Sequence, residues 1–274
     1  MNKLEVSHLE LDHISVYYEH YRHPNADKTV VLLHGFLSST FSFRRLIPLL
    51  CENFHVISID LPPFGKSGKS RLYSYSYQNL AMTVIRLLEK LDKDKVILIG
   101  HSMGGQIALN VSYQKPELVE QIILLCSSGY LNRSKLSLTI VSYVPFFYLF
   151  VKFWLARSGV MKNLLNVVHD HGLIDDAMVS GYLHPFIQDN GIFKALTKMI
   201  RDREGDLSTE VLRQIETPCL LIWGEHDKVV PVQKGTRLNK DLKHSNMIIL
   251  PNTGHLVPEE RPEEIYHHIK QFTL

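Results

Sequence analysis

Residues 96–114 of this chain read VILIGHSMGGQIALNVSYQ, and this stretch decides the fold. Residues 96–99 form a β-branched, apolar run that predicts a buried strand. Residues 105–113 predict a helix that ends before the Lys115-Pro116 pair. Residues 100–104 fit the pattern G-x-S-x-G between the two elements, so Ser102 is expected at the apex of a tight turn.

Such a turn brings the backbones of the strand and the helix close together. A Cβ atom at position 100 or 104 would clash there, which explains the two glycines. The turn leaves the Ser102 hydroxyl exposed above the N-terminus of the helix. The five-residue pattern alone is common, but its strand–turn–helix context favours a nucleophilic serine over a merely structural turn.

A serine hydroxyl is a weak nucleophile at neutral pH, so this hypothesis requires a base and a group that orients the base. Among 15 histidines, His255 is favoured because it follows a strand-like segment, residues 246–250, in a glycine-containing loop. Such a loop can reach a site at the carboxyl edge of a sheet. The alternative is a hydrogen-bonded loop histidine. The final helix is expected to begin near Pro258, which makes His267 and His268 surface or packing residues.

Asp227 is the candidate for the orienting acid. Residues 219–223 predict another buried strand, and Gly224-Glu225-His226-Asp227 is the turn that leaves it. Glu225 is the competing carboxylate in the same turn. The end of the strand at residues 122–126 carries no acid.

The order Ser102, Asp227, His255 is the chain order of the catalytic triad in α/β-hydrolases. Over nearly its whole length the sequence resembles that superfamily, and within it the serine hydrolases of the esterase and lipase type. The resemblance implies an α/β fold: a doubly wound, mostly parallel, eight-stranded sheet with a helical cap inserted after the sixth strand.

Residues 30–36, VVLLHGF, match a strand that runs into the His-Gly turn of the superfamily. The resemblance implies that the backbone N–H groups of Phe36 and Met103 form the oxyanion hole. His34 is interpreted as a structural hydrogen-bonding residue. Residues 60–68, DLPPFGKSG, resemble a loop of the family in which glycine is usual at the place of Pro63. The Gly-Lys-Ser triplets here lack the earlier glycine of a phosphate-binding loop, so nucleotide binding is not expected.

The strand pattern agrees with this fold. Residues 3–20 predict an antiparallel pair at one edge of the sheet. Further strands are expected at the following positions: 29–33, 55–59, 96–99, 122–126, 219–223 and 246–250. Helical patterns between most of them predict a mainly parallel sheet with ligands at its carboxyl ends. We therefore predict a core of residues 1–129 and 206–274, with residues 130–205 as a helical cap within the same domain.

Residues 136–155 in this segment are exceptionally apolar and just long enough to span a bilayer. Pro145, Lys152 and the position between two halves of one domain argue against a membrane span. The favoured interpretation is a cap that faces an apolar substrate tunnel, with transient membrane or micelle contact as the alternative. Substrate contacts within residues 130–205 stay unassigned.

Bulk properties fit a single-domain enzyme. The formal net charge of +2 indicates neither a nucleic acid nor a strongly acidic partner. Cys51, Cys126 and Cys219 show no metal-binding or disulfide spacing, so we expect small buried side chains in a reducing compartment. We expect no metal and no cofactor, and the N-terminus lacks the apolar core of a signal peptide, which predicts a cytoplasmic protein. The oligomeric state stays open.

The predicted function is hydrolysis of carboxylic esters with an apolar acyl or alcohol part through an acyl-enzyme on Ser102. The same residues would serve a C–C bond hydrolase, a thioesterase or a cofactor-free perhydrolase. A non-catalytic small-molecule receptor is a further alternative. Dehalogenases and epoxide hydrolases of this fold use an aspartate nucleophile, so Ser102 argues against both.

Overall fold

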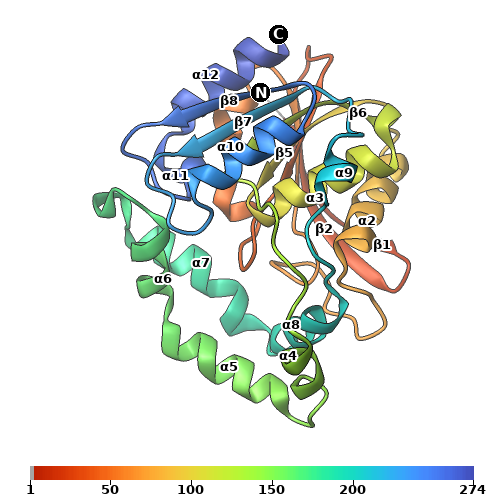
Figure 1. The fold of residues 1–274 in the computed structure, drawn as a ribbon. Helices are drawn as coiled ribbons and strands as arrows, with labels where there is room; N and C mark the ends of the chain where they lie inside the picture. The colour runs from red at the N-terminus through yellow and green to blue at the C-terminus, as the bar shows by residue number, and fades with distance from the viewer. Residues whose placement is uncertain (1–2) are drawn as a thin grey trace.

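The computed structural model describes residues 3–274, apart from the side chains of Lys3 and residues 184–188. Its centre is an eight-stranded sheet in the order β1-β2-β4-β3-β5-β6-β7-β8 (Figure 1). The strands are β1 (Lys3–Leu11), β2 (Ile14–Arg22), β3 (Thr29–Leu33), β4 (His55–Ile59), β5 (Val96–His101), β6 (Val119–Leu125), β7 (Cys219–Gly224) and β8 (Ser245–Leu250). β2 pairs antiparallel with β1 and β4, and the other neighbours are parallel. The predicted sheet is therefore confirmed, including the antiparallel pair at one edge.

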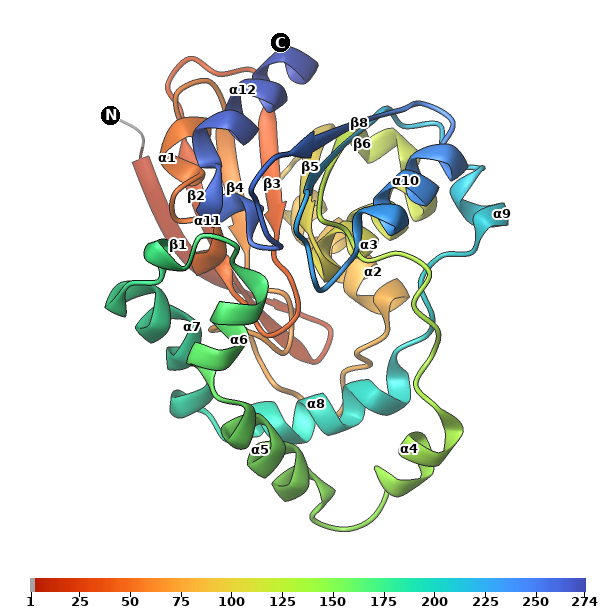
Figure 2. The same ribbon diagram turned by 60° about the vertical axis from the view of Figure 1, so that its left-hand side comes forward.

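Helices flank this sheet (Figure 2). The helices and turns outside residues 130–205 are η1 (Thr40–Phe43), α1 (Ile47–Leu50), α2 (Tyr77–Lys90), α3 (Met103–Gln114), η2 (Pro116–Leu118), α9 (Thr209–Leu212), α10 (Val232–Asp241), α11 (Val257–Glu260) and α12 (Pro262–Thr273). α1 packs on α12, α2 packs on α3, and α10 packs on β7 and β8. With β3 and β5 buried along their whole length, the core lies between these layers.

The C-terminal helix differs from the prediction. Pro258 lies in the short α11, and the final helix begins only at Pro262. Between the two, Arg261 has φ −139° and ψ 50°. A residue that precedes proline is disfavoured in the helical conformation, so Pro262 forces the break and then starts a new helix at its own first position.

The connection between β6 and β7 holds the remaining helices, and we call residues 130–205 the helical insertion. Its elements are α4 (Leu136–Val141), α5 (Phe147–Ser158), α6 (Val160–Val167), η3 (His171–Leu173), α7 (Asp176–Gln188) and α8 (Gly191–Asp202). The apolar run 136–155 is divided between α4 and α5 by a turn in which Phe146 has φ 65°. No helix among the described residues is long and apolar enough to cross a membrane. The boundaries at 130 and 205 stay a prediction.

Close backbone contact fixes the turn between β5 and α3. A Cβ atom on Gly104 would lie 2.0 Å from the carbonyl oxygen of Leu33 on β3, and one on Gly100 would lie 2.4 Å from the carbonyl oxygen of Gly104. The prediction that side chains would clash at both positions is confirmed. Gly105 is restricted too, because its Cβ would lie 2.3 Å from Ser127 Oγ.

Gly104→Ala should destabilise the fold, because the added methyl group meets main-chain atoms that cannot rotate away. Overpacking of this kind costs about 1–3 kcal/mol, measured as a lower free energy of unfolding in urea. Gly129→Ala is the matched control, since a Cβ there meets nothing within 4 Å. Equal stability of the two variants would contradict the close packing of α3 on β3.

Candidate active site

Ser102 lies at the turn between β5 and α3 in a strained backbone conformation, with φ 51° and ψ −117°. Its N–H donates to the carbonyl oxygen of Leu125 at 2.9 Å, and its own carbonyl oxygen accepts from the N–H of Ser128 at 2.9 Å. Residues at the end of the neighbouring β6 thus hold the turn. Within the described part of the chain, the Ser102 hydroxyl makes no hydrogen bond, and it lines a cavity.

His255 and Asp227 meet at the carboxyl ends of β8 and β7. His255 Nδ1 lies 2.7 Å from Asp227 Oδ2, and both side chains are buried. The other oxygen, Asp227 Oδ1, accepts the N–H groups of Val229 and Val230 at 2.8 Å each. A carboxylate partner places the proton of a neutral imidazole on Nδ1 and leaves Nε2 as the basic atom.

The pKa of Asp227 is lowered by its partners. Burial raises it, but the hydrogen bond and charge of His255 and the two amide donors outweigh burial. The carboxylate is therefore ionised at neutral pH and can hold the imidazole. Glu225, the competing acid, is exposed and accepts the N–H of Asn252 at 3.2 Å. The structure thus brings Asp227, and not Glu225, to His255.

The ring of His255 is further held by His101, which the sequence did not single out. The two ring centroids are 4.9 Å apart, and His101 Nε2 lies 2.9 Å from the carbonyl oxygen of His255. Burial lowers the pKa of His101 to about 3, with the charge of His255 acting in the same direction. His101 is therefore a neutral donor to the loop and not a second base.

The two amides proposed for the oxyanion hole lie beside Ser102. Met103 is the first residue of α3, and Phe36 follows Gly35, whose Cβ would lie only 3.2 Å from Ser102 Cβ. Across the described residues, neither the Phe36 nor the Met103 N–H has a hydrogen-bond acceptor. Both donors are thus available to an oxyanion formed next to Ser102.

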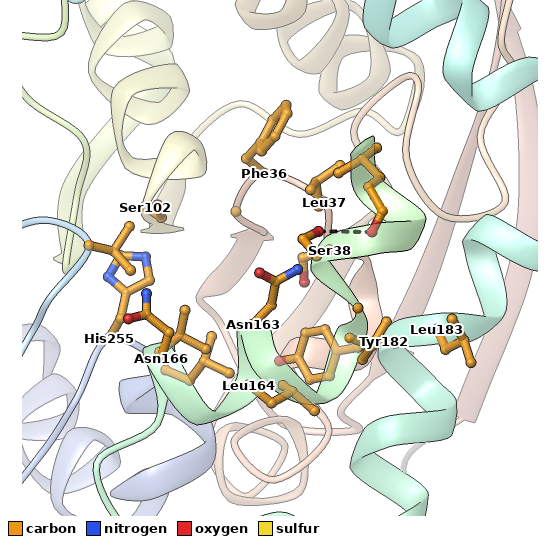
Figure 3. A pocket seen from close by; sticks show the side chains of 18 of the residues that line it. Phe36, Leu37, Ser38, Ser102, Asn163, Leu164, Asn166, Tyr182, Leu183 and His255 are labelled. Carbon is orange, nitrogen blue, oxygen red and sulfur yellow. Dashed lines mark hydrogen bonds between the residues drawn. The ribbon is translucent and has the colours of Figure 1, made fainter. Parts of the chain in front are cut away.

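A cavity of about 570 Å³ opens over Ser102 and His255 (Figure 3). Its apolar wall comes from the core and from the helical insertion, and it includes Phe36, Leu37, Trp154, Leu155, Leu164 and Phe193. Polar groups are few, and the described side chains of the insertion contribute Lys152, Ser158, Asn163, Asn166 and Tyr182. In Figure 3, Ser102 and His255 lie together at one end, and Tyr182 and Leu183 lie at the other.

The insertion contacts the His255 loop directly. The N–H of His255 donates to the carbonyl oxygen of Val167, the last residue of α6, at 2.7 Å. Glu260 bridges the same two segments: Oε1 accepts the N–H of Gly254 at 2.9 Å, and Oε2 accepts the N–H of His169 at 2.8 Å and of Asp170 at 3.3 Å. A buried carboxylate therefore ties the candidate base to the insertion.

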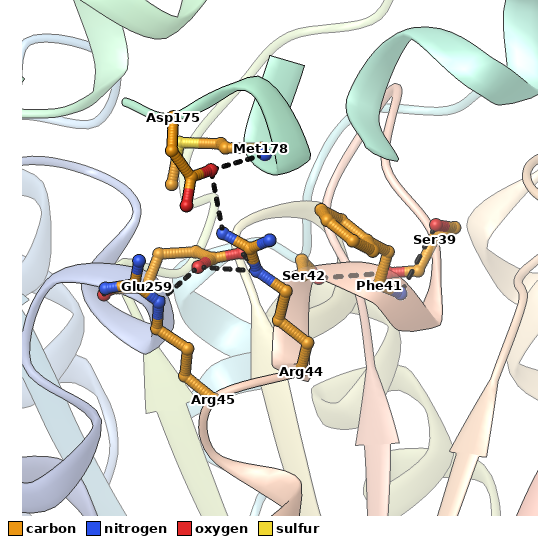
Figure 4. A network of polar contacts seen from close by, with 8 residues as sticks. All are labelled: Ser39, Phe41, Ser42, Arg44, Arg45, Asp175, Met178 and Glu259. Carbon is orange, nitrogen blue, oxygen red and sulfur yellow. Dashed lines mark hydrogen bonds and ion pairs between the residues drawn. The ribbon is translucent and has the colours of Figure 1, made fainter. Parts of the chain in front are cut away.

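A second anchor surrounds Glu259, whose side chain is fully buried (Figure 4). Its carboxylate accepts the Arg44 Nε–H at 3.1 Å and pairs with Arg45 Nε at 3.2 Å. Arg44 also reaches Asp175 at the start of α7, with 3.7 Å between Nη2 and Oδ1. The ion pairs thus connect the insertion to the segment that follows Phe36.

Cys126, Asp227 and His255 form a group whose potential ligand atoms lie within 4.8 Å of one another. Burial raises the pKa of the Cys126 thiol, which disfavours the thiolate that a metal ion requires. Asp227 and His255 are in addition bonded to each other. These three side chains therefore fit a protonated Cys126 thiol packed against the Asp227–His255 pair better than they fit a metal site.

His34 makes structural hydrogen bonds, as predicted. Its Nδ1 lies 2.7 Å from the carbonyl oxygen of Gly35, and Nε2 accepts the N–H of Leu61 at 2.9 Å. Burial lowers its pKa to about 4, so the ring is neutral. The loops that follow β3 and β4 meet at the buried Asp60, whose carboxylate accepts the N–H groups of Thr40 and Lys66 at 2.7 Å each.

Residues 30–267 match the Alpha/beta hydrolase family, to which this chain belongs. The chain is 55% identical over 262 residues to the uncharacterized hydrolase YugF of Bacillus subtilis (strain 168), covering 96% of this chain and 95% of that protein. It is 28% identical to 2-hydroxy-6-oxo-6-(2'-aminophenyl)hexa-2,4-dienoic acid hydrolase of Metapseudomonas resinovorans, over 86% of this chain and 80% of that one. The solved structure of a membrane phospholipase A, described as a bacterial virulence factor, has a TM-score of 0.79 and 27% identity, over 98% and 85% of the two chains.

Glu260→Gln should loosen the contact between the His255 loop and the insertion, because glutamine keeps one acceptor oxygen and loses the charge. Hydrogen bonds to charged groups contribute about 1.5–3 kcal/mol, so the free energy of unfolding should fall by roughly that amount. Denaturant unfolding measures it, with the exposed Glu263→Gln in α12 as the control. If both variants unfold alike, Glu260 does not tie these segments together.

Proposed function

We propose that this α/β-hydrolase is a serine hydrolase that cleaves carboxylic esters with an apolar acyl or alcohol part. One observation carries the proposal: His255, which is paired with Asp227, lines the same cavity as Ser102, and Ser102 sits on a strained turn beside two amides without acceptors. A nucleophile, an oriented base and oxyanion donors are the groups that acyl transfer requires.

In the proposed mechanism, His255 Nε2 takes the proton of Ser102 as Oγ attacks the ester carbonyl carbon. Asp227 keeps the imidazole oriented and stabilises its cation. The N–H groups of Phe36 and Met103 hold the oxyanion, and each donor contributes about 3–4 kcal/mol to stabilising the transition state. His255 then protonates the leaving alcohol, and a water molecule that it deprotonates releases the acid from Ser102.

The cavity supports an apolar substrate. Most of its lining is aliphatic or aromatic, and Lys152 is the one lysine or arginine among the described residues that line it. An acyl chain or ring would be buried there, while a strongly anionic substrate would find few partners. The solved phospholipase A, whose fold matches 98% of this chain, supports an ester substrate as well.

Cleavage of a C–C bond is the second candidate, and the 28% identity to the dienoic acid hydrolase supports it. The same serine, base and oxyanion donors would serve that reaction. Thioester hydrolysis and perhydrolysis would also use these groups. Only assays with different substrates can distinguish these candidate reactions, because all of them use the same triad residues.

Ser102→Ala should lower kcat for 4-nitrophenyl butyrate by at least about 10³-fold, because no other group can form the acyl-enzyme. Release of nitrophenolate measures the rate, and circular dichroism checks that the variant folds. The exposed Ser74→Ala should retain full activity. Normal turnover by Ser102→Ala would overturn the proposed function.

A series of nitrophenyl esters from acetate to octanoate tests the apolar cavity. Burial of a methylene group contributes about 0.8 kcal/mol, so kcat/KM should rise by up to about fourfold per added methylene until the cavity is full. An acyl-CoA and a ring-fission dienone are assayed beside the esters. A higher kcat/KM for either of these would reject the ester in favour of the thioester or the C–C bond.

A further inference from the structure

The outer side of the helical insertion exposes an unusual number of large apolar side chains. More than half of the exposed large apolar residues in the described part of the chain fall between residues 136 and 165. We call their first part the apolar face, which consists of Leu136, Leu138, Ile140, Val141, Tyr143, Val144, Phe146, Leu149, Phe150, Phe153 and Trp154. Exposed aromatic clusters of this kind mark interaction sites, whereas single exposed apolar residues are ordinary.

α5 is apolar on both sides. Its inner side packs against the core through Tyr148, Val151 and Leu155. On the outer side, Phe150 is 58% exposed and Phe153 is 64% exposed. Figures 1 and 2 both show α5 at the edge of the molecule, and in Figure 2 α8 lies between α5 and the sheet. A helix that is apolar all round is normally buried, so the outer side of α5 is expected to have a partner.

The charge of this segment indicates which partner. Residues 131–169 contain no aspartate or glutamate and five basic residues, namely Arg133, Lys135, Lys152, Arg157 and Lys162. They carry +5, whereas the whole chain carries +2, so the remaining residues carry −3. A symmetric dimer through the apolar face would bring two segments of like charge together. An anionic lipid surface offers both apolar chains and the opposite charge.

The apolar face is continuous with the cavity over Ser102. Trp154 is 60% exposed and also lines that cavity, and Leu155 lines it from the inner side of the same helix. Val160 and Leu164 extend the lining along α6. A bilayer in contact with α5 would therefore lie next to the cavity that Ser102 lines.

We infer that the apolar face of α4 and α5 docks this protein on anionic phospholipid membranes, with the exposed Arg157 and Lys162 contacting the headgroups. The helices lie in the interface and do not span the bilayer, in keeping with their division at Pro145 and Phe146. This inference rests on the proposed function only for the nature of the substrate that the membrane supplies. Docking itself requires no chemistry at Ser102.

Sedimentation with vesicles tests the inference. The Ser102→Ala protein is mixed with vesicles of phosphatidylcholine alone or with 30% phosphatidylglycerol, and the bound fraction is measured after centrifugation. Binding should be at least about tenfold stronger to the anionic vesicles and should weaken as salt is raised. Because this variant lacks the nucleophile, the result is independent of the proposed hydrolysis.

Two double variants locate the contact. Phe150→Ser with Phe153→Ser removes apolar area, and Arg157→Glu with Lys162→Glu reverses charge. Each should weaken binding to the anionic vesicles by about tenfold or more. Neither pair lines the cavity, so in the protein with Ser102 intact, hydrolysis of a soluble short-chain ester should stay unchanged.

Matched controls lie outside the apolar face. Leu72→Ser removes a side chain that is 79% exposed, and Lys90→Glu with Lys270→Glu makes the same charge change on α2 and α12. These controls should bind as the parent does. Equal binding to both vesicle types, no binding, or undiminished binding by the insertion variants would overturn the inference. The inference would also be overturned if the parent protein binds no vesicles but is a dimer, and Phe150→Ser with Phe153→Ser converts that dimer to a monomer.

Discussion

The approach of α3 to β3 at the Ser102 turn is the constraint on which the rest of the site depends. Gly104 lies so close to the carbonyl oxygen of Leu33 that no side chain fits between them. This contact, together with the hydrogen bonds of Ser102 to the end of β6, maintains a positive φ at a residue with a side chain. In this strained conformation the Ser102 hydroxyl projects into the cavity, and the N-terminus of α3 faces the same cavity.

Everything else at the site is arranged around that fixed point. Parallel strands place the loops after β3, β7 and β8 at one edge of the sheet, and these loops deliver Phe36, Asp227 and His255. The His255 loop is additionally bonded to the helical insertion through Val167 and Glu260. The insertion therefore shapes the cavity and also supports the proposed base. Movement of α6 would change the position of His255.

Much of this arrangement could be predicted because the signals are local. Glycines that flank Ser102 within a strand–turn–helix pattern define the turn, and strand ends followed by Asp227 and His255 define the other loops. The supporting contacts carry no such signal. Glu260 accepts amides from a segment some 90 residues earlier in the chain, and His101 bonds the loop that contains His255. The break at Pro262 was missed because Pro258 is itself a suitable helix start.

The most direct test of the account is a crystal structure of the protein after reaction with a fluorophosphonate, which leaves a phosphonyl group on an activated serine. We predict continuous density from Ser102 Oγ to phosphorus, with the phosphonyl oxygen within hydrogen-bond distance of the Phe36 and Met103 N–H groups. His255 Nε2 should face the modified oxygen. An unmodified Ser102, or an adduct whose oxygen points away from both amides, would contradict the account.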